Sequence, residues 1–343
     1  MATSALTLPH VRPVEPPVRA KPFDAEDPRM LNLLQGVLPD TITGAATRRA
    51  AAARPVSIFG VPFDGAVGGR KGAAEGPAAI REAFRYFSSF DATSDTQLLG
   101  LDLVDHGDVE VVPDDTRTTH DRAADVVEAV VRSGRVPVAL GGDHSLTYAH
   151  VAGLARATEG RIGIIVVDAH YDLRPVGPDG HVSSGTPFRR ILEELKPDAH
   201  GPRVRGMDLF EIGLRPFANS ASLAAYAKGQ DVRTVTTREL RLRGVDAVLS
   251  EAAERLQQVD HLWLSIDIDG VDQAHAPGCS APTPEGLLPE ELDTISRWAG
   301  SDARFAGLDL LETAPRYDPT GNTARVGALA ILHALAGLVD GRK

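Results

Sequence analysis

RIGIIVVDAHYDLRP, residues 161–175, is the most informative stretch of this 343-residue sequence. Its first half is a continuous run of apolar, mostly β-branched residues. A strand with one face in solvent would alternate instead, so this run indicates a strand buried on both faces. Asp168, His170 and Asp172 follow the run on alternate positions. Polar side chains are costly to leave unpaired at the edge of a core, so the stretch predicts a buried parallel strand that ends in a functional site.

The same pattern recurs along the chain from residue 55 onward. Short apolar runs alternate with segments of helical periodicity, which favours a parallel sheet covered by helices on both faces. The predicted strands lie in residues 55–64, 136–140, 161–167, 209–214, 232–236, 261–266 and 303–311, and the predicted helices in 76–87, 119–134, 145–157, 186–195, 246–258, 289–300 and 326–338. We therefore expect an α/β fold: a single doubly wound domain with a central, mostly parallel sheet of about eight strands. A (β/α)₈ barrel is the main alternative, and in both architectures ligands gather at the carboxyl ends of the strands.

Composition limits the classes of function. Acidic residues outnumber basic ones 47 to 36 and the formal net charge is -11, which argues against nucleic acid or an anionic membrane as the main partner. No apolar run approaches the about 20 residues that span a bilayer. The only cysteine, Cys279, excludes an intramolecular disulfide and is expected to be a small buried hydrophobe. With no signal-type apolar core at the N-terminus, we expect a cytoplasmic protein.

The first fifty residues differ from the rest because they are rich in proline and poor in paired apolar positions. We expect residues 1–50 to form an extension that is either mobile or laid over a neighbouring subunit as an arm. Residues 51–343 are expected to form the catalytic domain.

Three polar clusters follow predicted strands. GGDHS, residues 141–145, places Asp143 and His144 after one strand, and its two glycines would permit a tight turn with unusual backbone angles. Residues two apart on an extended chain point the same way, so the ligands at 168, 170 and 172 form one row. Asp267 and Asp269 repeat this arrangement after another strand, and Asp272 follows. Together these side chains outnumber the ligands of one ion and suit Mn²⁺ or a related cation, so a two-metal site with an activated water is predicted.

The motifs GGDHS, DAHYD (168–172) and SIDIDGVD (265–272) resemble, in this order and at these separations, the three signatures of the ureohydrolase family, which contains arginase, agmatinase and formimidoylglutamase. Further matches lie at residues 69–84, 103–109 and 309–328. The resemblance implies an arginase-like three-layer sandwich and two Mn²⁺ per subunit, with Ni²⁺ or Co²⁺ as possible substitutes. It also implies a homotrimer or homohexamer.

The resemblance also assigns roles to individual residues. His144 would bind one ion and His170 the other, Asp168, Asp172 and Asp267 would bridge or share them, and Asp269 would bind the second ion. The implied metal ligands are therefore His144, Asp168, His170, Asp172, Asp267 and Asp269. Asp143 would orient an imidazole, and Asp272 would support its loop without touching metal. Glu312 would hold the cationic nitrogens of an amidine or guanidine substrate, and Asp172 would relay a proton to the departing amine.

Departures from the arginase and agmatinase patterns point to one branch of the family. Where agmatinases have a histidine before Gly-Thr-Pro-Phe, this chain has Ser183 and Ser184, and His181 lies nearby but out of register as a possible catalytic replacement. The segments DAHYDLRP, SSGTPFRRIL, IGLRPFANS and APGCSAP resemble formimidoylglutamase instead. The resemblance therefore implies hydrolysis of N-formimidoyl-L-glutamate to L-glutamate and formamide, as in histidine degradation.

A substrate with two carboxylates requires a clamp. A guanidinium offers bidentate recognition of a carboxylate, and Arg174 lies two residues past the last ligand. Arg189 and Arg215 are weaker candidates for this clamp, and Ser184, Asn219 and Glu312 are further expected substrate contacts.

Three alternatives stay open at this point. The first is a guanidino hydrolase of the agmatinase, guanidinobutyrase or arginase type, which would release urea. The second is a binuclear metallophosphoesterase, which also places Asp and His at strand ends. The third is a non-catalytic relative that uses the fold as an oligomeric scaffold.

Overall fold

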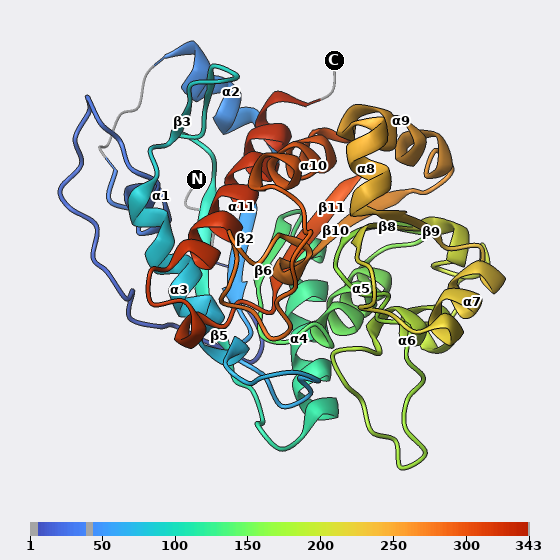
Figure 1. The fold of residues 1–343 in the computed structure, drawn as a ribbon. Coiled ribbons are helices and arrows are strands. Elements are labelled where there is room, and N and C mark those ends of the chain that lie inside the picture. Colours follow the sequence, from blue (N-terminus) through green and yellow to red (C-terminus); the bar gives the residue numbers. More distant parts are fainter. Residues whose placement is uncertain (1–5, 39–43, 342–343) are drawn as a thin grey trace.

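The computed structural model describes residues 6–38 and 44–341, and its centre is one nine-stranded sheet (Figure 1). In spatial order the strands are β1 (Val11–Arg12), β5 (Leu103–Val109), β2 (Val56–Gly60), β6 (Val136–Leu140), β11 (Phe305–Leu311), β10 (His261–Asp267), β7 (Ile162–Val167), β8 (Leu209–Leu214) and β9 (Arg233–Thr236). Only the edge strand β1 is antiparallel to its neighbour. A separate hairpin pairs β3 (Phe90–Asp91) with β4 (Thr96–Gln97).

Helices cover both faces of the sheet, which gives three layers (Figure 1). One face packs against α1 (Met30–Leu34), α2 (Ala45–Ala52), α3 (Gly76–Ala83), α8 (Thr237–Arg243), α9 (Val245–Arg255), α10 (Pro289–Ser301) and α11 (Asn322–Asp340). The other face packs against α4 (Thr116–Arg132), α5 (Leu146–Ala157), α6 (Pro187–Glu194) and α7 (Ala221–Gly229). The sheet is open, with edges at β1 and β9, so the doubly wound prediction is confirmed and the barrel alternative is wrong.

The central strands are apolar throughout because both of their faces are covered. Every residue of β2, β6 and β7 is buried, and the side chains divide between two hydrophobic cores, one on each side of the sheet. On β7, Ile165 and Val167 belong to one core while Ile164 and Val166 belong to the other. A single-faced strand could not bury such a run, and this explains why the alternation expected of amphipathic strands is missing.

Strand β5, which lies between the edge strand β1 and β2, is polar and was not among the predicted strands. Its residues Asp105 and Asp108 both bind the buried guanidinium of Arg81 on α3, at 2.7 Å in each case. Arg81 is only 4% exposed, and a guanidinium with two carboxylate partners satisfies its desolvated donors. This charged strand is therefore tied to the helix layer by ion pairs in addition to the apolar packing of Leu103 and Val109.

The described part of the N-terminal extension lies on its own domain. Val11 of β1 pairs with Val109 of β5, and the side chains of Met30 and Leu33 on α1 are buried in the first core. Helix α2 runs from residue 45 to 52, so the predicted boundary at residue 50 falls inside a helix. Residues 6–38 thus include segments that pack on the chain's own domain, while the division at residue 50 and a contact with a neighbouring subunit stay predictions.

Helix α11 is long and apolar enough, at 19 residues, to match a membrane span by length and composition. Within its most apolar 18-residue stretch 67% is buried, and the helix packs mainly against α10 and α3. Burial in the core accounts for its apolar character.

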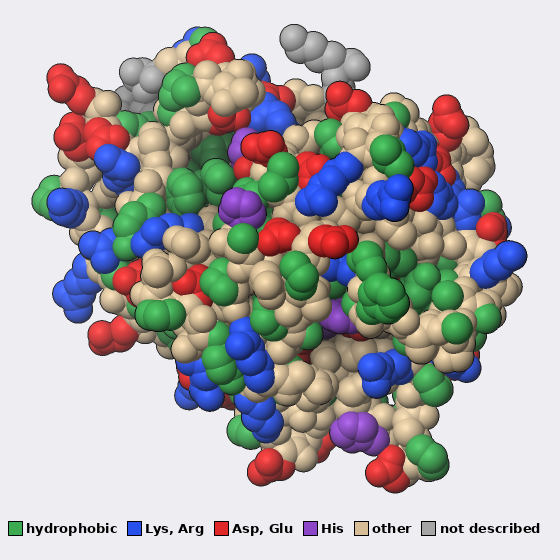
Figure 2. Space-filling view, in the orientation of Figure 1, with side chains coloured by type: hydrophobic (Ala, Val, Ile, Leu, Met, Phe, Trp, Pro, Cys, Tyr) green, Lys and Arg blue, Asp and Glu red, His purple; other side chains and the backbone are tan. Residues whose placement is uncertain are grey.

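On the molecular face shown in Figure 2, acidic and basic side chains are interspersed.

Candidate metal centre and active site

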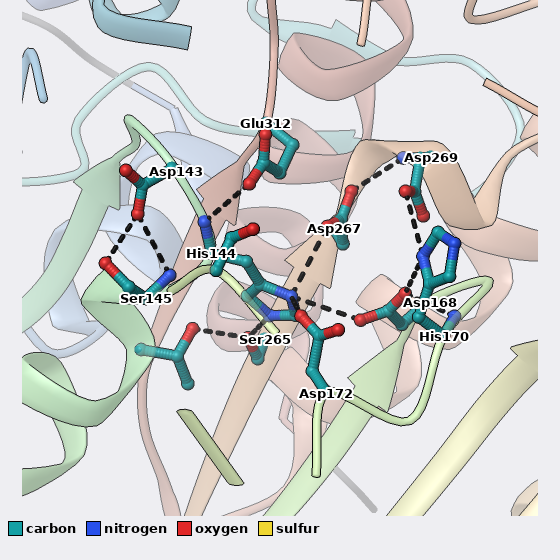
Figure 3. A network of polar contacts seen from close by, with 12 residues as sticks. Asp143, His144, Ser145, Asp168, His170, Asp172, Ser265, Asp267, Asp269 and Glu312 are labelled. Carbon is teal, nitrogen blue, oxygen red and sulfur yellow. Dashed lines mark hydrogen bonds and ion pairs between the residues drawn. The ribbon is translucent and has the colours of Figure 1, made fainter. Parts of the chain in front are cut away.

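Four adjacent strands at the middle of the sheet carry the predicted site at their carboxyl ends. They are β6, β11, β10 and β7. The loop after β6 carries His144, Glu312 follows β11, Asp267 ends β10, and Asp168 follows β7. Segments far apart in the sequence therefore meet because parallel strands end on the same edge (Figure 3).

The first group of donors surrounds His144. Its Nδ1 atom lies 3.1 Å from Asp168 Oδ2, 2.9 Å from Asp172 Oδ2 and 3.3 Å from Asp267 Oδ2. One ligand atom from each of these four residues can be chosen so that all lie within 4.8 Å of one another. Both His144 and Asp168 are fully buried.

The second group shares Asp168 with the first. His170 Nδ1 lies 3.4 Å from Asp168 Oδ1 and 3.2 Å from Asp269 Oδ2. The two oxygens of Asp168 thus face different groups, as a bridging carboxylate would. The six predicted ligands form two adjacent donor sets, which fits the expected pair of ions.

The chemistry of the donors fits cations better than a hydrogen-bond network. Three carboxylate oxygens point at one imidazole nitrogen, although that nitrogen can donate at most one hydrogen bond. His144 Nδ1 and Asp168 Oδ2 are buried without a hydrogen-bond partner among the described residues. Oxygen and imidazole ligands converging in this way suit Mn²⁺ and similar divalent ions.

The pKa values in the centre shift in both directions. Burial would raise the pKa of Asp168, but the two neighbouring imidazoles outweigh it and lower that pKa. Burial and the neighbouring Asp168 raise the pKa of Asp172 to about 6. Burial, Asp269 and Asp168 raise the pKa of Asp267 well above its usual range. Burial alone would lower the pKa of His170, but Asp269 and Asp168 outweigh it and raise that pKa to about 12. So many buried negative charges call for cations.

The other nitrogen of His144 is held by Ser265 on β10. His144 Nε2 lies 3.2 Å from Ser265 Oγ, so Nδ1 is left to face the carboxylates. Asp143 makes no direct hydrogen bond to an imidazole, although the family resemblance implied that it would orient one. It accepts hydrogen bonds from the backbone of Ala66 at 2.9 Å and Ser145 at 3.1 Å, and so braces the loop that carries His144. Asp272 accepts from Ala274 and Gly286 within its own loop, in agreement with its predicted supporting role.

The two glycines after β6 are required by close packing. Neither Gly141 nor Gly142 has a positive φ angle, contrary to the predicted unusual backbone. A Cβ atom on Gly142 would lie 1.8 Å from the carbonyl oxygen of Phe63, and one on Gly141 would lie 2.5 Å from that of Leu310. Only glycine lets the loop after β6 approach these neighbouring segments so closely.

Two predicted catalytic residues have strained backbones. The φ angles of Asp172 and Glu312 are +46° and +63°, a region that residues with a Cβ atom rarely adopt. Glu312 Oε1 accepts a hydrogen bond from the backbone N–H of His144 at 2.8 Å, whereas Oε2 is buried without such a partner among the described residues. Burial and the neighbouring Asp143 raise the pKa of Glu312 to about 8.

A pocket of about 390 Å³ opens over the metal-ligand cluster. Arg174, His181 and Ser184 line it together with Glu312. Arg174 is exposed, and its side chain has no hydrogen-bond or ion-pair partner within residues 6–38 and 44–341. Ser184 Oγ accepts a hydrogen bond from the backbone N–H of Gly68 at 2.9 Å, so its own hydroxyl proton is available to a ligand.

Other predicted substrate contacts lie outside this pocket. Arg215 is buried and gives its guanidinium to the backbone oxygens of Thr283, Asp269 and Val271. Asn219 bonds the backbone of Tyr171 and Ala169, so it braces the ligand loop. Arg189 pairs with Glu193 at 2.9 Å and stacks on Tyr226. The sequence could not show that Arg215 and Asn219 satisfy backbone groups in the fold, or that Arg189 pairs with side chains outside the pocket.

The structure adds pocket residues that had no assigned role. They are Gly68, Gly69, Ser183, Gly185, Ser280 and Ala281. Ser280 also acts on Glu312, because its hydroxyl opposes the rise in the pKa of that carboxyl. Its neighbour Cys279 is buried as predicted, and burial raises the pKa of its thiol. The segments GRKG and APGCSAP did resemble the family, but periodicity gave no reason to single out these residues.

The fold and the donor cluster define an α/β protein with a candidate dinuclear metal centre. A family model described as the arginase family matches residues 54–337. The chain is 39% identical to the formimidoylglutamase of Halobacterium salinarum, covering 82% of this chain and 87% of that protein. It is 34% identical to the mitochondrial agmatinase of Gallus gallus, covering 82% of this chain and 80% of that protein. A solved Trypanosoma cruzi formiminoglutamase with Mn²⁺ superimposes with a TM-score of 0.79 at 27% identity, over 92% of this chain and 100% of that one.

This chain belongs to the arginase family. The resemblance seen in the three motifs is thereby confirmed, as is the expectation of a hydrolase with the arginase-like three-layer fold. The family depends on two metal ions, which agrees with the two donor sets. The phosphoesterase alternative receives no support from these relatives.

Proposed function

We propose that this protein hydrolyses N-formimidoyl-L-glutamate to L-glutamate and formamide. The observation that supports this best is the pairing of Glu312 and Arg174 in one pocket. Glu312 is buried next to the metal-ligand cluster, where a cationic amidine would be held. Arg174 lies at the exposed side of the same pocket with an uncommitted guanidinium, which suits a carboxylate. The relative from Halobacterium salinarum carries the corresponding name.

In this proposal His144, Asp168, His170, Asp172, Asp267 and Asp269 hold two divalent cations, most simply Mn²⁺, as in the solved Trypanosoma cruzi relative. When bound, such ions lower the pKa of a water molecule, so that a nucleophile is available near neutral pH.

The chain's own residues then position the substrate and move the proton. Glu312 holds the amidinium so that its carbon faces the ligand cluster, and Arg174 fixes the glutamate portion. Water oxygen adds to the amidine carbon, the bond from that carbon to the glutamate nitrogen breaks, and Asp172 passes a proton to the departing amine. His181 at the rim is a second candidate for this proton transfer.

A substrate panel tests the proposal directly. The protein is purified, loaded with Mn²⁺ and given N-formimidoyl-L-glutamate, agmatine, arginine, 4-guanidinobutyrate and guanidine in separate assays for formamide and urea. We expect formamide from the first substrate at a kcat/KM at least about tenfold above any urea release, because one satisfied charged contact contributes about 1.5–3 kcal/mol. Turnover of agmatine alone would overturn the proposal, since agmatine has no carboxylate for Arg174.

Arg174→Ala isolates the proposed clamp. Loss of a charge-assisted contact should raise KM for the acidic substrate about 10- to 100-fold, with little change in metal content. Arg189→Ala is the matched control, because Arg189 lies outside the pocket and pairs with Glu193. Equal effects of the two changes would contradict the assignment.

The assembly, metal and location form a separate part of the proposal. We propose a cytoplasmic homotrimer or homohexamer with Mn²⁺ as the native ion. A monomeric mass by light scattering would refute the proposed trimer or hexamer. Metal analysis of protein purified from its natural host, without added metal, would decide between Mn²⁺ and Ni²⁺ or Co²⁺.

A further inference from the structure

A second buried polar group lies beside the metal-ligand cluster, on the side of His144 away from Asp168. It consists of Asp143, Ser145, His120 and Arg190, and none of these residues is more than 5% exposed. Figure 3 shows the first two next to His144, with their side chains directed away from the metal ligands. The mechanism above gives this group no task, and burying four polar side chains together is costly unless all of them are paired.

The hydrogen bonds in this group have only one consistent direction. A guanidinium can only donate, so His120 Nδ1, 3.1 Å from Arg190 Nη1, has to accept. The proton of a neutral imidazole is then on Nε2, which lies 2.9 Å from Ser145 Oγ and donates to it. The Ser145 hydroxyl in turn donates to the Asp143 carboxylate, which only accepts.

The chain of contacts closes on itself through the backbone. Asp143 Oδ2 accepts from the N–H of Ala66 at 2.9 Å, and the carbonyl oxygen of Ala66 accepts from the N–H of Ser184 at 2.7 Å. Ser184 lies in the pocket, in the loop directly before α6, and Arg190 lies on α6 itself. The circuit therefore joins the loop of His144 to the loop and helix that face the substrate.

Helix α6 also touches the predicted ligands directly. The ring of Phe188 packs edge-on against the imidazole of His144 with 5.4 Å between centroids, and its backbone N–H donates to the carbonyl oxygen of Asp172 at 3.2 Å. A shift of α6 would therefore move the pocket wall relative to the ligand cluster. In an active site, a displacement of about 1 Å can cost about 100-fold in rate.

We infer that His120 is a positioning residue: held as the neutral Nε2–H tautomer between Arg190 and Ser145, it fixes the substrate-facing loop relative to the metal-ligand loop. His120 touches neither the predicted ligands nor the pocket. Its surroundings agree with a neutral ring, because burial and the adjacent Arg190 lower the pKa of His120 to about 3. The inference rests on the proposed function only for the choice of substrate in the kinetic test.

Two substitutions test separately the two hydrogen bonds of the His120 ring, one with Arg190 and one with Ser145. In His120→Asn the amide oxygen can replace Nδ1 toward Arg190, but the side chain is too short to reach Ser145. In His120→Gln the amide N–H₂ can replace Nε2 toward Ser145. His106→Gln is the control. His106 Nε2 also binds a serine, Ser57, at 3.0 Å, but His106 is on β5, next to the edge strand β1.

Kinetics of the metal-loaded proteins form the first arm. We expect His120→Asn to lose about 10- to 100-fold in kcat/KM, with a lower kcat and a higher KM, while the metal content stays at the wild-type value. His120→Gln should recover most of this loss, and His106→Gln should behave like the wild type. Equal losses in His120→Asn and His120→Gln, or a His120→Asn loss no larger than that of His106→Gln, would reduce His120 to an ordinary structural residue and overturn the inference.

Nitrogen-15 NMR of the metal-free protein, labelled at histidine, forms the second arm and needs no turnover. The signal that disappears in His120→Gln is assigned to His120. We expect a neutral ring with its proton on Nε2 at every pH from 6 to 8. A proton on Nδ1, or on both nitrogens, would overturn the inference. Failure of the wild type to hydrolyse N-formimidoyl-L-glutamate would instead remove the proposed function and leave this arm valid.

Discussion

Two pockets of this protein gather carboxylates, and they differ in what those carboxylates face. Beneath the smaller pocket, of about 390 Å³, Asp168, Asp172 and Asp267 converge on one imidazole nitrogen. The larger, of about 760 Å³, lies between α2, α9, α10 and α11. There, Arg297 binds Asp91 and Asp340, and Arg49 binds Asp340 as well. Carboxylates neutralised by guanidinium groups need no metal, so convergence on shared points, and not cavity size, marks the metal centre.

The largest expected effect comes from breaking the shared ligand. Asp168→Asn removes a charge that faces both donor groups, so both ions should bind more weakly. Since replacing even an outer partner of a metal ligand costs about 10- to 100-fold, kcat/KM should fall by more than about 100-fold. Metal content per chain and turnover are measured together. Asp340→Asn, in the larger pocket, should keep its metal and most of its activity, and loss of metal there would erase the distinction between the pockets.

Removing the metal tests the same difference between the two pockets through the thermal stability of the protein. The folded donor groups bind ions that the unfolded chain cannot hold as tightly, so added Mn²⁺ should raise the melting temperature. At a free ion concentration of about 100 times Kd the gain is about 2.7 kcal/mol per site. Wild type and Asp340→Asn should both show the gain after chelation and re-addition, measured by calorimetry. Asp168→Asn should show much less. An equal gain in all three proteins would place the ions elsewhere.

Glu312→Gln addresses the substrate grip instead of the metal. The amide keeps an oxygen that can accept from the N–H of His144, so the local fold should persist. The negative charge that would hold the amidinium is lost, and removal of one such electrostatic contact costs about 100- to 1,000-fold in kcat. Metal content should stay unchanged, because Glu312 is not one of the converging donors. Metal loss in this variant would count against its assignment as a substrate residue.

The sequence predicted the ligand cluster well because the cluster depends on local periodicity. Alternate residues on an extended chain share a face, so the row at 168, 170 and 172 and the pair at 267 and 269 could be recognised without coordinates. Their convergence also required adjacency of β6, β11, β10 and β7, and this strand order is a property of the whole topology. The family resemblance, and not the periodicity, implied that these clusters converge.

The contacts of the other polar side chains could not be predicted, because their partners are distant in sequence. Arg215 and Asn219 looked like substrate contacts until the fold placed backbone oxygens and amides around them. Strand β5 is charged, and its carboxylates are explained only once the fold places Arg81 of α3 beside that strand. His120 lies 25 residues from Ser145 and gave no motif. Polar side chains that serve the fold and those that serve chemistry are alike in sequence, and only their contacts separate them.

The smallest expected effect concerns Asp293, in the larger pocket. Burial, together with Glu290 and Asp91, raises its pKa from 3.8 to about 7. The folded state therefore keeps a proton that the unfolded chain releases near pH 4. This contribution to the free energy of unfolding is fully present below pH 4 and is lost as the pH rises through 7. Between pH 5 and 8 the loss is on the order of 2 kcal/mol. Asp293→Asn should flatten this part of the pH profile of urea unfolding, whereas Asp246→Asn, at the same pocket, should leave it intact. An unchanged slope in Asp293→Asn would mean that this carboxyl is ionised in the fold, and that the larger pocket carries more unpaired charge than its arginines suggest.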